Sequence, residues 1–94
     1  MAKGTKSEPG SLTKEVAGIL RAQISRKKFS QTAVAADVGI SQTQLSGILN
    51  AKKHVDIEQL DDICWAIGLN FRDVIAEADK ETADRHLLRR SPKP

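Results

Sequence analysis

The sequence is poor in aromatic residues and in long hydrophobic runs, and each shortage narrows the class of protein. It has one Trp, two Phe and no Tyr among 94 residues, so the core must consist of Leu, Ile, Val and Ala, which favours packed helices over a β-sandwich. No apolar run can span a bilayer, and residues 1–11 lack the apolar stretch of a signal peptide. We therefore expect a single all-α domain in the cytoplasm, with no membrane contact.

Cysteine and histidine are also scarce, which argues against an enzyme and against a metal site. The single cysteine, Cys64, cannot form an internal disulfide, and its place in an apolar helical stripe favours a buried thiol that packs as a small hydrophobe. His54 and His86 lie in a basic loop and in the tail, with no spacing that brings them to Cys64. Since a structural zinc needs about four ligands, the sequence predicts no catalytic residue, metal, cofactor or small-molecule ligand.

Charges of opposite sign lie in separate segments, although the net charge is only +3. Residues 1–30 carry seven Lys and Arg against two acids, whereas residues 56–79 carry one Arg against seven acids. Residues 80–94 are basic again, with five cations and two acids. Such segregation lets one face meet a polyanion while another is repelled from it. Charge alone does not distinguish this arrangement from an ordinary solvated surface.

The hydrophobic pattern divides the chain into three segments. Residues 1–10 are rich in Gly, Lys, Ser and Pro without apolar periodicity, so we expect a flexible basic arm. Apolar residues recur at helical spacing over residues 11–79, where we expect five helices. Residues 80–94 are expected to form a charged tail or to extend the last helix, and Leu87 and Leu88 can serve that extension or a partner.

Capping residues mark the boundaries of the expected helices. The first helix begins near Ser11 and closes at the cations of residues 26–28, where the helix dipole favours positive charge. Ser30 caps the second helix, and Gly39 ends it with the positive φ of a tight turn. The caps expected for the last three helices are Ser41 with Gln44, Asp56 with Gln59, and Asn70 with Asp73.

The fourth helix has an apolar stripe that we expect to face the core. Its members are Ile57, Leu60, Ile63, Cys64 and Ile67, with Gly68 at the end of the helix. The acids around its start, Asp56, Glu58, Asp61 and Asp62, are expected to stabilise the first turn rather than to bind a cation.

Residues 31–50, QTAVAADVGISQTQLSGILN, carry the pattern on which a functional assignment depends. Two helices that cross at roughly 90 to 120° through a short turn need a small residue where they touch and a glycine in the turn. Ala35 and Gly39 meet these two needs. The residues expected to anchor the helix pair inward are Val34, Ile40, Leu45 and Ile48.

The other side of the third helix is polar and has no carboxylate and no large apolar group. Its residues are Gln42, Thr43, Gln44, Ser46 and Gly47. Gln can pair with N6 and N7 of adenine in the major groove, Ser and Thr can bond several base edges, and the Thr methyl can touch the thymine methyl. This chemistry fits base reading, although solvated helix residues would look the same and Gln44 also serves as the capping partner.

Groups that can hold phosphate lie on both sides of this polar surface. The expected phosphate contacts are Ser30, Gln31, Ser41, Asn50, Lys52 and Lys53. In the arm, Lys3 and Lys6 can follow a groove, although two lysines are common in any mobile tail. The acids of residues 56–62 are expected to face away from DNA.

Residues 12–76 resemble the lambda-repressor and Cro type of helix-turn-helix domain, also called the XRE family. The resemblance rests on SQTAVAADVGISQTQLSGILNAKK together with DIEQLDDICWAIGLNFRDVI. It implies a five-helix domain in which Gln31 fixes a phosphate and braces the reading helix. It also implies that Gln42 and Thr43 meet base edges, with Ser46 and Gly47 one turn deeper. Family members often have Gly after the third helix, where this chain has Ala51, which resists positive φ.

The resemblance implies a transcriptional regulator, and we expect a repressor of the phage or bacterial type on a double-stranded operator. A homodimer is inferred from the family, with half-sites about one helical turn, roughly 34 Å, apart. Two alternatives stay open. An antitoxin or adaptor would act mainly through protein contacts of residues 80–94, and a nonspecific coating protein would prefer no sequence. RNA binding by stacking needs exposed aromatic residues, and we expect all three aromatic residues to be mostly buried.

Overall fold

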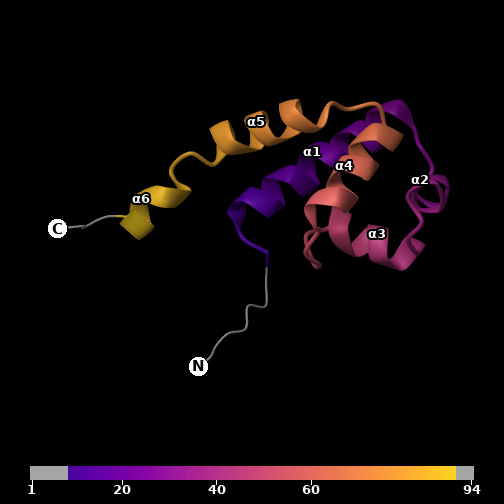
Figure 1. Ribbon diagram of the computed structural model, residues 1–94, viewed down its shortest axis with the longest axis horizontal. Helices are drawn as coiled ribbons and strands as arrows, with labels where there is room; N and C mark the ends of the chain where they lie inside the picture. Colours follow the sequence, from indigo (N-terminus) through magenta and orange to yellow (C-terminus); the bar gives the residue numbers. More distant parts are fainter. Residues whose placement is uncertain (1–8, 91–94) are drawn as a thin grey trace, which may run out of the picture.

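The computed structural model describes residues 9–90, and within that range it contains six helices and no strand (Figure 1). The helices are α1 (Ser11–Lys27), α2 (Gln31–Val38), α3 (Gln42–Leu49), α4 (Ile57–Ala66), α5 (Phe71–Glu81) and α6 (Arg85–Arg90). The expected all-α class is confirmed, and the tail contributes a separate short helix beyond the other five (Figure 1). Lys3 and Lys6 lie outside the described residues.

One apolar core joins the first five helices. α1 packs against α5 and α3, while α2 packs against α3 and α4. The side chains that are less than 2% exposed include Leu20, Leu45, Ile48, Leu49, Ile63, Cys64 and Ile67. Since burial of one such side chain contributes about 1.5–3 kcal/mol, this aliphatic core fixes α3 in position. None of the helices in the described range is both long and apolar enough to cross a membrane.

Four helices begin at the predicted capping residues. In each case a side-chain oxygen accepts a hydrogen bond from the backbone N–H three residues later, at 2.7 to 3.1 Å. The four caps are Ser30, Ser41, Asp56 and Asn70. One such cap stabilises a helix by about 1 kcal/mol. α1 differs because its cap residue is Gly10, which supplies no side chain.

Four turns use a left-handed backbone. Gly39 ends α2 with φ 82°, and Gly68 follows α4 with φ 79°, as expected. Lys28 and Ala51 adopt the same region at φ 59° and 56°, although this conformation costs a residue with a side chain about 1–2 kcal/mol. The replacement of Gly by Ala at position 51 therefore does not keep the turn after α3 from taking a positive φ.

The prediction of burial is wrong for Trp65, Phe29 and Ile57, whereas Phe71 is half-buried and packs against the core. Trp65 is 84% exposed and Ile57 is 72% exposed, while Phe29 lies at 38%. The side of α4 toward the core is already filled by the other members of its stripe, which are buried. Ile57 and Trp65 share a second line with Asp61, at spacings of four residues, and this line faces solvent.

Candidate nucleic-acid interface

α2 and α3 form the expected helix-turn-helix. The N–H groups of Gly39 and Ile40 both donate to the carbonyl oxygen of Ala35, at 2.9 and 3.0 Å, which closes the turn. Leu45 and Ile48 are no more than 1% exposed. Because the inner stripe of α3 is held in the core, the opposite side of the helix is presented to solvent.

The side chains expected to read bases gather on that outer side. Gln42 and Thr43 are exposed, Ser46 is half-buried, and the three line one open hollow. Gln44 and Gly47 are half-buried and are not part of the lining. No residue of α3 carries a charge. The surface therefore offers hydrogen-bonding groups without a carboxylate that would repel phosphate.

A hydrogen bond from α2 orients the first of these side chains. Thr32 Oγ1 donates to Gln42 Oε1 at 3.2 Å. The amide oxygen keeps its second lone pair, and Nε2 keeps both of its hydrogens; these are the groups that pair with adenine. The resemblance assigned the bracing to Gln31, but here the bond between the two helices comes from Thr32, which the sequence reasoning missed.

The predicted phosphate contacts before α3 lie at helix starts. The hydroxyl oxygens of Ser30 and Ser41 accept the capping bonds from Ala33 and Gln44, so each hydroxyl still has a hydrogen to donate. Gln31 is half-buried in the first turn of α2. That turn contains no acid, and the positive end of its dipole favours an anion.

The predicted phosphate contacts after α3 gather with a lysine from α1. Asn50 and Lys52 line a second hollow together with Lys14 and Pro9. Asn50 Nδ2 donates to the Ser46 carbonyl oxygen at 3.0 Å, which fixes the amide over the end of α3. Lys14 was not predicted, because nothing in the local sequence signals its approach to residues 50–52.

Lys53 lies across Gly47. A Cβ placed on Gly47 would lie 2.8 Å from Lys53 Cγ and 2.9 Å from Cδ. The N–H groups of Lys52 and Lys53 donate to the Gly47 carbonyl oxygen at 2.8 and 3.1 Å, which holds the loop against the helix. The aliphatic stem of Lys53 thus covers the site where Gly47 was expected to face a base.

Two side chains of α1 satisfy carbonyl groups at the ends of other helices. Arg21 Nη1 donates to the Leu49 carbonyl oxygen at 2.6 Å, at the end of α3. Gln23 is buried, and its Nε2 donates to the Ile67 carbonyl oxygen at 2.9 Å, at the end of α4. These bonds use carbonyl oxygens that a helix end leaves without a partner, and they tie α1 to both helices.

Cys64 has the properties of a structural thiol. Its side chain is fully buried, and that burial, helped by the negative charge of Asp61, raises the pKa of the thiol to about 11. The group is therefore protonated at neutral pH. A protonated, enclosed thiol is a poor nucleophile, which agrees with the predicted packing role.

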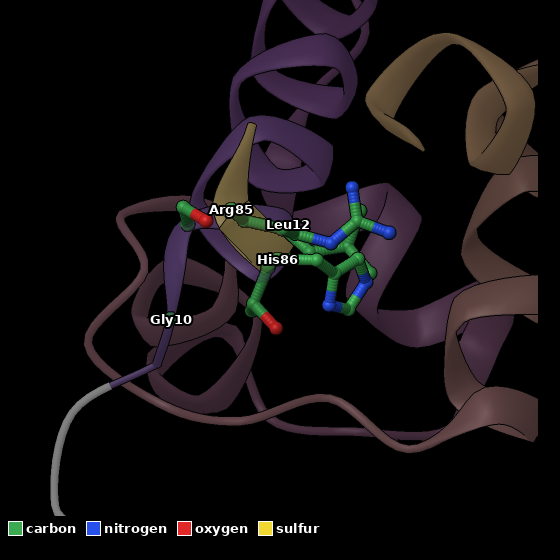
Figure 2. Close-up of a pocket in the computed structure, with 6 residues that line it drawn as sticks. Gly10, Leu12, Arg85 and His86 are labelled. Atoms are coloured by element: carbon green, nitrogen blue, oxygen red, sulfur yellow. The ribbon is translucent and has the colours of Figure 1, made fainter. Parts of the chain in front are cut away.

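Figure 2 shows a pocket away from α3, where α6 meets the start of α1. Gly10, Leu12, Arg85 and His86 line it, and the side chains of Arg85 and His86 lie beside Leu12 (Figure 2). No carboxylate is among its described lining residues.

Comparison with solved structures identifies similar proteins. A structure of the clp gene regulator ClgR from Corynebacterium glutamicum is 28% identical with a TM-score of 0.69, and the match covers 80% of this chain and 96% of that one. A second structure of the same regulator is 26% identical with a TM-score of 0.68, covering 92% and 99%. A search of curated proteins gave no match.

A family model identifies the domain. Residues 19–77 match the model of the Cro/C1-type HTH DNA-binding domain. The match covers more than half of the chain and includes α2, α3 and every residue expected to contact bases. The chain therefore belongs to the family of Cro/C1-type helix-turn-helix DNA-binding domains.

Proposed function

We propose that the chain is a sequence-specific transcriptional repressor that reads the major groove of double-stranded DNA with the outer side of α3. The observation that carries this proposal is the accessible, carboxylate-free hollow of Gln42, Thr43 and Ser46. The similar protein ClgR is a gene regulator, which supports a role in transcription. A protein bound over a promoter excludes other proteins from that stretch of duplex, so DNA binding at such a site represses transcription without a further activity.

Phosphate contacts on both sides of α3 support this orientation. Gln31 and the first-turn amides of α2 lie on one side, and Asn50, Lys52 and Lys53 lie on the other. Lys14 joins the second group through its shared hollow with Lys52. Such contacts set the register of a protein on the duplex without specifying a base.

We infer that two copies bind one operator. α3 has eight residues, so it extends over only about 12 Å, at 1.5 Å per residue. It can touch only a few base pairs, and each good bidentate contact discriminates by about 1–3 kcal/mol. A second copy doubles the number of base pairs read, which favours a two-fold operator with half-sites roughly 34 Å apart.

Selection of bound duplexes from a random pool tests the whole proposal. We expect a short preferred sequence that occurs twice with two-fold symmetry. A reporter gene placed under the selected site should be expressed less when the protein is present. Recovery of duplexes with no shared sequence would overturn sequence-specific binding.

Gln42→Ala tests the reading role of α3. The substitution should cost about 1–3 kcal/mol on the selected site, since it removes the pairing amide, and it should leave binding to unrelated duplexes nearly unchanged. Gln59→Ala is the matched control, because it removes the same side chain from the first turn of α4, and it should change neither affinity. An equal loss on selected and unrelated duplexes would contradict base reading by Gln42.

A further inference from the structure

Two large apolar side chains on α4 take no part in the proposed DNA interface. Trp65 is 84% exposed and Ile57 is 72% exposed. Asp61 lies between them on the same line, and Glu58 and Asp62 are exposed on the same side. We call these five residues the α4 face. Its three carboxylates repel a DNA backbone, whereas its apolar surface is typical of a site that contacts another protein.

A segment of opposite charge lies at the other end of the chain. Residues 80–94 carry five cations and two acids, and within this segment Leu87 on α6 is 67% exposed. This segment therefore combines positive charge with an exposed apolar side chain.

The start of α6 is fixed to the end of α5 in its own chain. Arg85 Nη2 lies 2.8 Å from Asp79 Oδ1, and Arg85 Nη1 donates to the carbonyl oxygen and the Oγ1 of Thr82 at 2.9 and 2.8 Å. Figure 1 shows α6 at one end of the molecule, well separated from α4. α6 therefore cannot reach the α4 face of its own chain while these bonds hold.

We propose that the α4 face of one copy receives α6 of a second copy. The inference rests on the homodimer proposed above and names its contact surfaces. Trp65 and Ile57 provide apolar area for Leu87, and the negative charge of the α4 face is complementary to the net positive charge of residues 80–94; a Trp ring also attracts cations. Two α4 faces do not pair with each other, because their carboxylates repel. Since each copy carries both surfaces, a two-fold axis lets two copies exchange the contact.

Trp65 provides a direct measurement, because it is the only tryptophan in the chain. The full chain is studied over a range of concentrations by fluorescence and by sedimentation. We expect the emission to move to shorter wavelength as the mass rises from monomer to dimer, since the indole ring leaves water. Dimerisation without a shift in emission would overturn the proposal, as would a chain that stays monomeric throughout.

Leu87→Ser tests the other half of the contact. Because Leu87 is exposed, the substitution should leave urea unfolding unchanged at a concentration where the chain is monomeric, but it should weaken dimerisation at least tenfold and remove the shift of Trp65 emission. Ala22→Ser, at an exposed position of α1, is the matched control and should change neither. Unchanged dimerisation in Leu87→Ser would exclude α6 from the interface.

Failure of this proposal can be told apart from failure of DNA reading. If α3 reads DNA and α6 joins the copies, Leu87→Ser selects the same half-site sequence without the two-fold repeat. If the wild-type chain selects no sequence, the repressor proposal fails, while the Trp65 measurement still decides whether α6 meets the α4 face.

Discussion

α3 and α4 are built alike on their inner sides and differently on their outer sides. Each is a short helix that begins at a side-chain cap. The Ser41 hydroxyl oxygen accepts a hydrogen bond from the Gln44 N–H at 3.0 Å, and an Asp56 carboxylate oxygen accepts one from the Gln59 N–H at 2.7 Å. Each places fully buried aliphatic side chains in the common core. The outer side of α3, however, has no charge, whereas that of α4 has three carboxylates and an exposed Trp65.

This difference shows that the inner and outer sides of one short helix have separate roles. The inner residues determine where the helix lies, since they fill the core. In both α3 and α4 these residues include buried Leu and Ile side chains. The outer residues determine which surface the helix can meet. In the proposed function, the carboxylates of α4 are repelled by a duplex while the uncharged α3 is not, which favours an approach with α3 toward DNA.

The largest effects are expected on the inner sides, where the two helices are equivalent. Leu45→Ala on α3 and Ile63→Ala on α4 should each lower the free energy of unfolding by about 2–5 kcal/mol, because each leaves a cavity in a closely packed core. Urea unfolding measures both. Thr43→Ala, on the outer side of α3, should stay within about 0.5 kcal/mol. Similar losses for Leu45→Ala and Thr43→Ala would remove the distinction between the two sides.

The next largest effects are expected when the outer side of α3 gains a carboxylate and the outer side of α4 loses one. Gln42→Glu places a carboxylate on α3, which cannot donate to adenine N7 and is repelled by phosphate, so binding to the selected site should weaken by about 1–3 kcal/mol. Glu58→Gln makes the opposite change on α4 and should leave the affinity for a duplex with a single half-site unchanged, because the α4 face contacts a second copy and not DNA. Titration of a labelled duplex measures both. Equal effects of the two substitutions would show that both helices lie near the DNA.

The turns on either side of α3 should respond in opposite directions. Gly39→Ala should lower stability by about 1–2 kcal/mol, because φ 82° is unfavourable for a residue with a side chain. Ala51→Gly should relieve the same strain, and the extra freedom of glycine in the unfolded chain, about 0.4–1 kcal/mol, should leave a small gain. Thermal unfolding at one protein concentration measures both changes. A loss of stability in Ala51→Gly would contradict strain at Ala51.

The smallest expected effect concerns a single phosphate contact. Lys53→Ala should weaken binding to every duplex alike and reduce the slope of log affinity against log salt by about 0.9. Arg72→Ala, at an exposed position of α5, should leave the slope unchanged. If Lys53→Ala affects only the selected sequence, Lys53 contacts a base and not the backbone.

The helix starts, the turn and the inner stripe of α3 could be predicted because their causes are local. Ser41 and Asp56 lie three residues from the N–H groups that they bind, and Leu45 and Ile48 are spaced by less than one turn. The outer side of α3 follows from the same spacing once its inner side is known. Fold class and candidate reading residues are therefore readable from short windows of sequence.

The contacts that refine the site could not be predicted, since they join distant parts of the chain. Thr32 meets Gln42 only because the helix-turn-helix brings α2 and α3 together. Gln23 is buried under the Ile67 carbonyl group, and Lys14 reaches the hollow beside Lys52. Ile57 was misplaced for a related reason: hydrophobic periodicity gives the direction of a stripe, but the amount of neighbouring structure decides how wide a stripe is covered.

The position of Lys53 across Gly47 links two kinds of recognition at one point of the surface. Any side chain introduced at position 47 would first displace the lysine stem, whose Cγ lies 2.8 Å from where a Cβ would be. With the phosphate contact proposed for Lys53, a variant that acquired a new base preference at position 47 would also change its affinity for the phosphate backbone. Among the described residues, no lysine lines the hollow of Gln42 and Thr43. A substitution at the amino end of α3 can therefore adapt the protein to a changed operator without displacing a lysine stem.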